Sequence, residues 1–383
     1  MNLLERRPRI LFLFSDTGGG HRSAAEAIIE AMQLEFGEQI VTEKVDFLKE
    51  YAPLPLNQLP DWYPYMVKMP QAWGVGFHLS DGDRRARFIN DAAWPYIRRA
   101  TRKFASHANE YDLIVSVHPL INTPMLRALG RSHVPYVTVV TDLVSTHALW
   151  YTPRVDLCIV PTEAARRRAI KFGMPEEKLQ VVGLPVAERF CQPPGDRAAL
   201  RQRMGWPQDR PVVLIVGGGE GMGPMGRISR RIDHAGLPVA LAIVTGRNQK
   251  LKARLADAHW TLPTYLYGFV RDMPDLMRAA DVLVTKAGPG TISEAFNASL
   301  PIVLYSRLPG QEDGNVKYVL AEGAGAWAPT AHSVVHTLRD WLYYPEKRLQ
   351  AVDAARRLAR PGAARQIARI LAARVGVEPA VEA

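Results

Sequence analysis

Short apolar runs alternate along the chain with longer stretches whose apolar residues recur every three or four positions. In the first half the apolar runs are Ile10–Phe14, Leu113–Val117, Tyr136–Thr141, Leu157–Val160 and Leu179–Val182. Runs that are apolar at consecutive positions predict strands with both faces buried, and the amphipathic stretches between them predict helices that cover those faces. The first half is therefore expected to form a doubly wound α/β domain with a parallel sheet.

The same alternation is repeated in the second half, after a Pro-, Gly- and charge-rich stretch that predicts a linker. Its apolar runs are Val212–Val216, Val239–Val244, Thr264–Gly268, Val282–Thr285 and Ile302–Tyr305. We expect an α/β fold of two Rossmann-like doubly wound domains, residues 1–190 and 191–383, that face each other across a cleft. The helical pattern near residues 355–377 either closes the second domain or packs back on the first.

A segment rich in proline and aromatic residues, Tyr51–Phe88, interrupts this alternation. Bulky aromatic side chains followed by arginines are the residue types with which a soluble protein enters the interface of an anionic bilayer. We therefore predict acceptor or membrane contacts for Trp62, Tyr63, Trp73, Arg84 and Arg85. The alternative is an aromatic-rich part of the first domain's core.

The composition is that of a folded globular chain of 383 residues, with 47% hydrophobic and 22% charged residues. The net charge of +10 favours an anionic partner, either a lipid surface or a nucleic acid. Because the chain shows no nucleic-acid-binding signature, we expect an anionic membrane surface and no nucleic acid. Two cysteines are too few for a disulfide framework and indicate a reducing compartment.

No apolar run has the roughly 20 residues that span a bilayer, and the first run is too short for the core of a signal peptide. The expectation is a peripheral, monotopic protein at the cytoplasmic face of the cell membrane, without a signal peptide or a transmembrane helix. The sequence does not indicate an oligomeric state.

Candidate chemistry begins in the loop that follows the first apolar run. The loop Ser15–His21 contains three consecutive glycines, which let a ligand approach the backbone closely, and it opens a helix whose first N–H groups are unpaired. His21 is an acid–base side chain at the carboxyl edge of a parallel sheet, where α/β enzymes place their sites. We predict a catalytic role for His21; the alternative is a tight turn with an incidental histidine.

A second glycine-rich loop, Gly217–Gly226, follows the first apolar run of the second half. Its GxGxxG match at Gly221–Gly226 on its own suggests a dinucleotide cofactor. The acidic residue expected about 20 positions further on is missing, because the next apolar run ends in Val244–Arg247. An NAD-dependent oxidoreductase is the alternative that this motif leaves open.

Two further loops follow predicted strands of the second half. Lys286–Ala295 combines glycines, Thr291 and an emerging helix N-terminus, which together can hold a diphosphate without a metal ion. Glu294 lies one turn into that helix, where its other possible role is that of a capping acid. Gly310–Asn315 places a carboxylate beside an amide, a pair that can hold both hydroxyls of a ribose; a solvated loop is the alternative.

Four motifs in this order resemble the monogalactosyldiacylglycerol synthase family. They are SDTGGGHRSAAEAI at Ser15–Ile28, GGGEGMGP at Gly217–Pro224, KAGPGTISEA at Lys286–Ala295 and GQEDGNVKYV at Gly310–Val319. The family belongs to glycosyltransferase family 28, alongside bacterial diacylglycerol glucosyltransferases and a peptidoglycan enzyme that transfers N-acetylglucosamine to a lipid. The resemblance implies the GT-B fold, a UDP-sugar donor, and inversion at the anomeric carbon to leave a β-linked glycolipid.

The resemblance also implies roles for individual residues. His21 matches the proposed catalytic base, Gln311 and Glu312 match ribose-side contacts, and Phe269 with Val270 matches the segment that holds uracil. The acceptor-side stretch of the family is resembled by Thr141–Leu143, His147 and Trp150. The sequence of Ser145–Trp150 differs at several positions from the plant-like form of this stretch. The predicted site in full has catalytic His21 and Asp142, acceptor contacts at His147 and Trp150, and donor contacts at Gly19, Gly20, Gly218, Gly219, Phe269, Val270, Gly288, Pro289, Gly290, Thr291, Glu294, Gln311, Glu312 and Asn315.

The expected reaction is the transfer of galactose from UDP-galactose to the sn-3 hydroxyl of 1,2-diacylglycerol, with no metal and no other cofactor required. Asp81–Asp83 resembles a metal-binding DxD motif, but no strand precedes it, and we interpret it as a solvated turn. The alternatives are UDP-glucose as the donor, another lipid acceptor, a GT-B-like sugar epimerase, and a nucleotide-sugar or lipid binding protein without catalysis.

Overall fold

The computed structural model describes residues 6–67, 69–130, 134–193 and 195–378. The chain divides into two compact units. The first comprises Met1–Glu188, Leu308–Gln311 and Gly362–Ala383, and the second comprises Arg189–Arg307 and Glu312–Pro361. Each unit contains one six-stranded sheet, so the predicted α/β fold with two Rossmann-like halves is confirmed. The last helix of the chain belongs to the first unit and not to the second.

The sheet of the first unit has the strand order β2-β1-β3-β4-β5-β6, and every neighbouring pair is parallel. Its strands are β1 (Arg9–Phe14), β2 (Val41–Asp46), β3 (Leu113–Ser116), β4 (Tyr136–Val139), β5 (Leu157–Val160) and β6 (Leu179–Val181). Its helices are α1 (Gly20–Phe36), α2 (Phe47–Tyr51), α3 (Leu59–Met66), α4 (Pro70–Ser80), α5 (Asp83–Ala105), α6 (Pro119–Leu129), α7 (Glu163–Lys171) and α16 (Ala363–Arg374), with a short 3-10 helix η4 at Ala148–Trp150.

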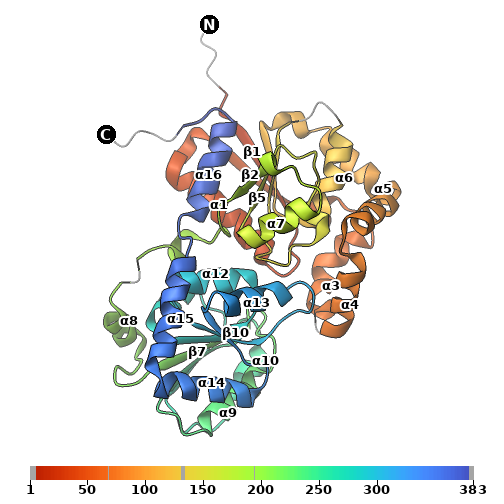
Figure 1. Cartoon of the computed structure of the whole chain (residues 1–383). Helices are drawn as coiled ribbons and strands as arrows, with labels where there is room; N and C mark the ends of the chain where they lie inside the picture. Colours follow the sequence, from red (N-terminus) through yellow and green to blue (C-terminus); the bar gives the residue numbers. More distant parts are fainter. Residues whose placement is uncertain (1–5, 68, 131–133, 194, 379–383) are drawn as a thin grey trace. The chain divides into compact units, whose positions relative to one another are not determined.

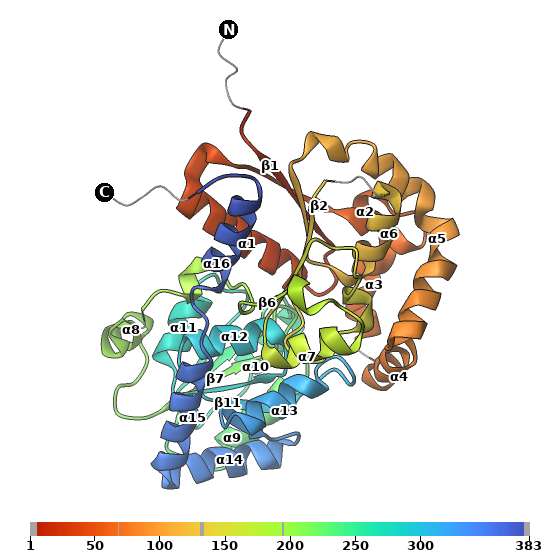
Figure 2. The same ribbon diagram turned by 45° about the horizontal axis from the view of Figure 1, so that its top comes forward.

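Alternating residues of each strand feed two separate cores. Ile10 and Phe12 pack with apolar residues of α1 and α16, and Figures 1 and 2 show these two helices side by side. Leu11 and Leu13 point to the other face and pack with α2, α5, α6 and α7. A parallel sheet covered on both faces leaves its polar chemistry to the loops at the strand ends.

Two features of the first unit differ from the pattern in the sequence. Tyr51–Phe88 is mostly helical, since it contains α3, α4 and the start of α5. The strand β2 was not predicted, because the polar residues Thr42–Lys44 give its sequence no apolar run; β2 is an edge strand with only its last two residues buried.

The sheet of the second unit has the order β12-β11-β10-β7-β8-β9, again with parallel neighbours. Its strands are β7 (Val212–Val216), β8 (Ala240–Val244), β9 (Thr264–Tyr267), β10 (Val282–Lys286), β11 (Ile302–Ser306) and β12 (Gly325–Trp327). Its helices are α8 (Arg197–Met204), α9 (Met225–Asp233), α10 (Gln249–Ala256), α11 (Met273–Ala279), α12 (Pro289–Asn297), α13 (Asp313–Ala321), α14 (Ala331–Tyr343) and α15 (Pro345–Leu358). One face packs on α9, α10 and α14, and Figure 1 shows α12 and α13 on the other side of the strands.

Candidate active site

The loop after β1 is shaped by two glycines in the left-handed region. Gly18 has φ 89° and Gly19 has φ 78°, conformations that strain any residue with a Cβ atom. A Cβ atom on Gly18 would lie 2.6 Å from Cε1 of Tyr63, so α3 packs directly on this loop. Gly19 is the N-cap of α1 and Gly20 is its first residue, which places His21 in the first turn of that helix.

His21 lies in a cluster built from the ends of three neighbouring strands, β1, β3 and β4. Its Nδ1 atom is 2.8 Å from Oγ1 of Thr141. Its ring centroid is 4.6 Å from that of His118 and 5.8 Å from that of Trp150. The imidazole is thus fixed by one hydrogen bond and two ring contacts.

The environment of His21 favours the uncharged ring. Burial lowers the pKa of His21, and this effect exceeds the opposing effects of the Asp142 charge, the Val117 carbonyl and the Asp16 charge. A histidine with a lowered pKa is neutral at neutral pH, which is the state that accepts a proton. The structure therefore gives His21 the protonation state that a general base requires.

His118 is a second histidine in the cluster that the sequence analysis did not single out. Its Nε2 atom is 3.0 Å from Oγ1 of Thr17, and its Nδ1 accepts a hydrogen bond from the backbone N–H of Leu120 at 3.3 Å. Burial, assisted by His21, lowers the pKa of His118 well below its usual value. His118 follows β3 as His21 follows β1, and this position after an apolar run was the available signal.

Asp142 follows β4 and is buried. Its Oδ2 accepts a hydrogen bond from Nε1 of Trp150 at 2.7 Å, and its Oδ1 accepts one from Nε2 of Gln311 at 3.1 Å. Gln311, expected among the donor contacts, therefore bonds to a predicted catalytic residue of the first unit. His21 and Asp142 interact through charge, but the imidazole shares its hydrogen bond with the preceding residue, Thr141.

His147 and Trp150 are buried, so neither belongs to an exposed membrane-contacting surface. Trp150 is completely buried and holds Asp142. Nε2 of His147 lies 3.0 Å from the hydroxyl of Ser80, and its Nδ1 accepts a hydrogen bond from the N–H of Leu149 at 3.1 Å. These contacts fasten η4 to the end of α4.

The interpretation of Asp81–Asp83 as a solvated turn is wrong for Asp81. The Asp81 side chain is only 15% exposed, pairs with Arg168, and accepts a hydrogen bond from the N–H of Ala148 at 3.0 Å. A carboxylate that loses this much water needs such partners. Asp81 therefore links α4 to α7 and η4.

In the second unit, the glycine loop after β7 lies against an exposed arginine, Arg247, of the loop after β8. A Cβ atom on Gly219 would lie 3.6 Å from Nη1 of Arg247. Arg247 pairs with Glu220 at 2.7 Å, and its guanidinium carbon lies 4.9 Å from the ring centroid of Phe269. Phe269 is exposed and Val270 is half-buried, so the segment expected to contact uracil lies beside this glycine loop.

The end of β10 carries an ion pair that the sequence analysis did not assign. Nζ of Lys286 lies 3.0 Å from Oε1 of Glu312, whose side chain is only 4% exposed. A Cβ atom on Gly288 would lie 2.9 Å from this Nζ, and one on Gly218 would lie 3.3 Å from Cε of Lys286. Lys286 therefore lies between both glycine loops of the second unit, and a Cβ atom at position 288 would displace its ammonium group. A basic residue at the end of a buried strand was the available signal.

The helix α12 starts directly after Gly288, its N-cap, which has no side chain to cap the helix. Pro289 has no N–H, and the N–H groups of Gly290 and Thr291 have no partner within the helix. One turn further on, burial raises the pKa of Glu294 to about 7, opposed by the charge of Arg189. The structure thus brings the predicted phosphate loop to a helix start that can bind an anion.

Asn315 ties this loop to α13. Its Nδ2 donates a hydrogen bond to the Ala287 carbonyl at 2.9 Å. Its Oδ1 is buried and has no hydrogen-bond partner in the described part of the chain. A buried acceptor without a partner costs free energy, and a hydroxyl or N–H of a ligand would remove that cost.

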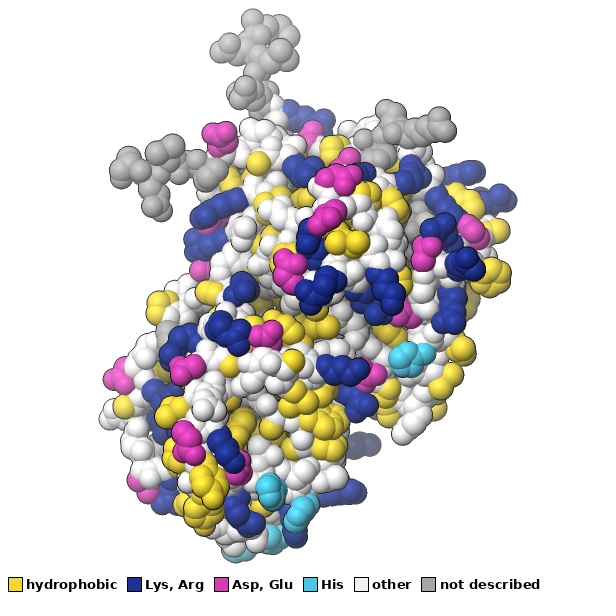
Figure 3. All heavy atoms as spheres, in the orientation of Figure 1, with side chains coloured by type: hydrophobic (Ala, Val, Ile, Leu, Met, Phe, Trp, Pro, Cys, Tyr) yellow, Lys and Arg dark blue, Asp and Glu magenta, His cyan; other side chains and the backbone are white. Residues whose placement is uncertain are grey.

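The residues predicted to contact a membrane have mixed exposure. Trp62, Arg84 and Arg85 are exposed, whereas Tyr63 and Trp73 are half-buried and pack edge to face with ring centroids 5.6 Å apart. Further exposed apolar side chains on or near α3, α4 and α5 are Leu54, Tyr65, Met69, Val75, Leu79, Phe88 and Tyr96. Figure 3 shows yellow hydrophobic and dark blue basic side chains together over the region of α5. This part of the first unit therefore presents both residue types that an anionic bilayer attracts.

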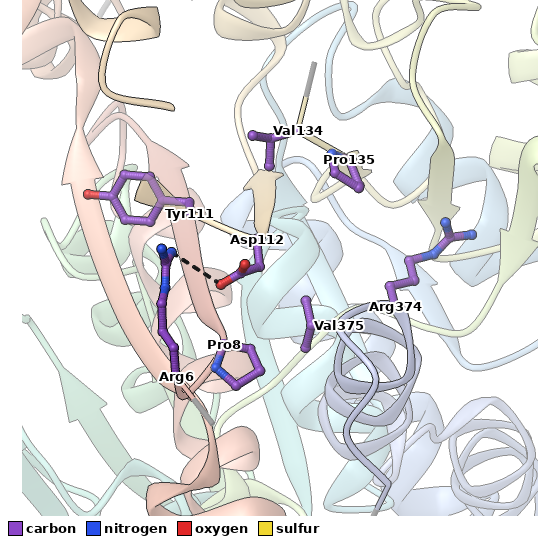
Figure 4. Close-up of a pocket in the computed structure, with 8 residues that line it drawn as sticks. All are labelled: Arg6, Pro8, Tyr111, Asp112, Val134, Pro135, Arg374 and Val375. Atoms are coloured by element: carbon purple, nitrogen blue, oxygen red, sulfur yellow. Dashed lines mark ion pairs between the residues drawn. The ribbon is translucent and has the colours of Figure 1, made fainter. Parts of the chain in front are cut away.

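A pocket lies at the opposite edge of the first sheet, among the residues labelled in Figure 4. Pro8, Asp112 and Pro135 line it, and each precedes a strand. Arg6 enters it and pairs with Asp112 at 3.7 Å. The candidate residues follow the carboxyl ends of the strands, so this pocket is not part of the candidate site.

Within the described ranges, no helix is both long and apolar enough to cross a membrane. The same residues contain no cluster of histidine, cysteine and acidic side chains suited to bind a metal ion.

Comparisons with known proteins place this chain among the family 28 glycosyltransferases. The model of the glycosyltransferase family 28 C-terminal domain matches residues 212–360, and the model of monogalactosyldiacylglycerol (MGDG) synthase matches residues 21–186. Monogalactosyldiacylglycerol synthase 1, chloroplastic, of Arabidopsis thaliana is 36% identical over 94% of this chain and 69% of its own length, and the chloroplastic synthase of Spinacia oleracea is 37% identical over 94% and 71%. The chain belongs to the monogalactosyldiacylglycerol synthase family, which confirms the resemblance found in the four motifs.

Solved structures with the same fold are more distant in sequence. A UDP co-structure of Staphylococcus aureus MnaA has a TM-score of 0.62 at 12% identity and covers 98% of this chain and 100% of its own. MurG of Acinetobacter baumannii has a TM-score of 0.57 at 16% identity and covers 95% and 99%. These similarities support the fold alone.

Proposed function

We propose that this chain transfers galactose from UDP-galactose to the sn-3 hydroxyl of 1,2-diacylglycerol, with inversion, and releases UDP. The proposal is carried by the half-buried His21 with its lowered pKa at the carboxyl edge of the first sheet, in a chain 36–37% identical to relatives named monogalactosyldiacylglycerol synthases. The alternatives without catalysis do not account for a half-buried imidazole with a lowered pKa in this position.

In the proposed reaction, His21 takes the proton of the acceptor hydroxyl as its oxygen attacks the anomeric carbon and the bond to the UDP oxygen breaks. The imidazolium that forms is stabilised by the Asp142 charge and the Val117 carbonyl, both of which raise the pKa of His21. A positioned base typically contributes roughly 10²–10⁴ to the rate.

The departing diphosphate gathers negative charge, which the second unit can neutralise without a metal ion. The N–H groups at the start of α12 and the Lys286 ammonium group supply that positive charge in our proposal. Asn315, with its unpartnered Oδ1, is proposed to accept a hydrogen bond from the donor. We further propose that no metal ion is required.

The exposed apolar and basic side chains of α3, α4 and α5 are proposed to bring the chain to a bilayer as a peripheral protein, at the cytoplasmic face of the membrane. Apolar side chains enter the interface and arginines meet anionic headgroups, each basic residue contributing about 1 kcal/mol. The relatives carry chloroplastic names, so the proposed membrane is defined only by its diacylglycerol and its negative charge.

The test is incubation of the protein with diacylglycerol vesicles and either UDP-galactose or UDP-glucose, in the presence of a chelator, with identification of the lipid product. A β-galactosyl lipid from UDP-galactose supports the proposal. A glucosyl product would correct the donor, and UDP-sugar turnover without any lipid product would favour an epimerase over a transferase. Binding of NADH without binding of UDP would contradict the proposal that the protein uses a UDP-sugar at all.

A further inference from the structure

The residue that hydrogen-bonds the proposed base is a threonine and not a carboxylate. Thr141 Oγ1 lies 2.8 Å from Nδ1 of His21, and Thr141 is buried just after β4. In a histidine base, the hydrogen bond at one ring nitrogen decides which nitrogen carries the proton and which is free to react. The residue bonded to Nδ1 therefore determines which nitrogen of His21 is free to accept a proton.

Both carboxylates near His21 are held by other side chains. Asp142 receives hydrogen bonds on both oxygens, from Trp150 and Gln311, and Asp16 pairs with Arg22 at 2.9 Å. They act on His21 through charge only, and that charge raises its pKa. Neither one fixes the orientation of the ring.

His118 does not occupy Nδ1 either. His118 contacts His21 by its ring and uses its own nitrogens on Thr17 and Leu120. Because its Nδ1 accepts the Leu120 N–H, the proton of neutral His118 is on Nε2, which donates to Thr17. The Val117 carbonyl raises the pKa of His21, because it accepts a hydrogen bond from the protonated ring.

We propose that Thr141 is the positioning residue of the base: its hydroxyl oxygen accepts the Nδ1–H of His21, which leaves the lone pair on Nε2 to take the acceptor's proton. The proton moves from the alcohol oxygen to Nε2, and Nδ1–H stays bonded to Thr141 throughout. This inference rests on the proposed function, in which His21 is the base. A neutral hydroxyl in this position orients the ring and leaves its pKa lowered by burial.

The tautomer can be measured without any turnover. In protein labelled with ¹⁵N-histidine, we expect the His21 signals at neutral pH to show a protonated Nδ1 and an unprotonated Nε2. Thr141→Val removes the hydroxyl at nearly constant shape and is expected to shift His21 toward the other tautomer, whereas Thr141→Ser keeps the wild-type signals. A wild-type His21 that carries its proton on Nε2 would overturn the inference, whether or not the protein transfers galactose.

Kinetics give a second readout. We expect Thr141→Val to lower kcat by roughly 10- to 100-fold, part of what a positioned base supplies, with the KM for UDP-galactose changed less than threefold and the acid limb of the pH profile moved to lower pH. Thr141→Ser should restore most of kcat. The matched control is Thr138→Val, because Thr138 is buried in β4 itself and its hydroxyl has no hydrogen-bond partner among the described residues.

The outcomes separate the two proposals. Equal loss in Thr141→Val and Thr141→Ser, or kcat within twofold of wild type in Thr141→Val, would contradict the role of the hydroxyl while leaving the proposed function intact. Wild-type protein that binds UDP but forms no galactolipid would contradict the proposed function, and the tautomer measurement would then decide the role of Thr141 on its own.

Discussion

Lys286 and Glu312 form an ion pair of 3.0 Å in which the ammonium side chain is 21% exposed and the carboxylate side chain only 4%. Removing one partner of a buried pair leaves the other charge poorly compensated, which typically costs 3–5 kcal/mol. Removing both charges together leaves no buried charge that has lost its counter-charge.

We therefore predict that Lys286→Met lowers the free energy of unfolding by about 3 kcal/mol, and that the double variant Lys286→Met/Glu312→Gln recovers most of that loss. Urea denaturation of the two proteins measures the difference. Lys317→Met is the control, because Lys317 is an exposed lysine of α13 in the same unit. Equal stability of the single and the double variant would show that the pair is not electrostatically coupled.

Loss of the imidazole of His21 should separate catalysis from donor binding. In His21→Ala we expect galactolipid formation to fall by roughly 10²–10⁴, the usual contribution of a general base, while the Kd for UDP stays within about twofold. Transfer from UDP-galactose to diacylglycerol vesicles and calorimetric UDP titration provide the two readouts. Transfer at the wild-type rate in a folded variant would remove His21 from the mechanism.

The central strands of both sheets could be predicted from the sequence because they are buried on both faces, so that Val212–Val216, for instance, is apolar at every position. The edge strand β12 (Gly325–Trp327) was not predicted, because it has three half-buried residues and no apolar run. Local composition carries no signal for a short strand whose hydrogen bonds come from its neighbour.

The candidate site could also be predicted only in part. His21 and the loop at Gly288 were predicted from motifs that occupy consecutive positions. Thr141 was predicted only as part of the acceptor-side stretch. Neither its contact with His21 nor the pair of Lys286 with Glu312 was predicted, because both contacts depend on the parallel order of the strands. His21 and Thr141 are 120 positions apart in the sequence, and Lys286 and Glu312 are 26 positions apart. Contacts at such separations depend on strand order, which no local sequence pattern contains.

His118 should make the stability of the protein depend on pH. Burial lowers its pKa well below 6.5 in the folded state, whereas the unfolded chain binds a proton near pH 6.5. Below that pH the unfolded state holds more protons, so the free energy of unfolding decreases as the pH falls from 6.5 toward the folded pKa. We expect a steeper decrease for wild-type protein than for His118→Asn in urea denaturation between pH 7.5 and about 5. Parallel curves would show that His118 is not held neutral.

The exposed apolar side chains of α4 allow a test of membrane binding that does not involve the reaction. Leu79 is 69% exposed on α4, beside the basic residues of α5, and Leu349 is 52% exposed on α15 of the second unit. Partial burial of a leucine in the bilayer interface is worth about 1 kcal/mol, a factor of about five in partitioning. Leu79→Ser should therefore weaken sedimentation with anionic diacylglycerol vesicles about fivefold, whereas Leu349→Ser should leave it unchanged.

The contribution of charge to that binding can be isolated in the same assay. Arg84 is exposed at the start of α5, so Arg84→Gln should weaken binding to anionic vesicles and leave binding to neutral vesicles unaltered, whereas Leu79→Ser should weaken both. Raising the salt concentration should abolish the effect of Arg84→Gln and preserve that of Leu79→Ser, because salt screens exposed charges and does not weaken apolar burial. If Leu79→Ser and Leu349→Ser bind equally well, the surface of α3 to α5 is not the one that meets the bilayer.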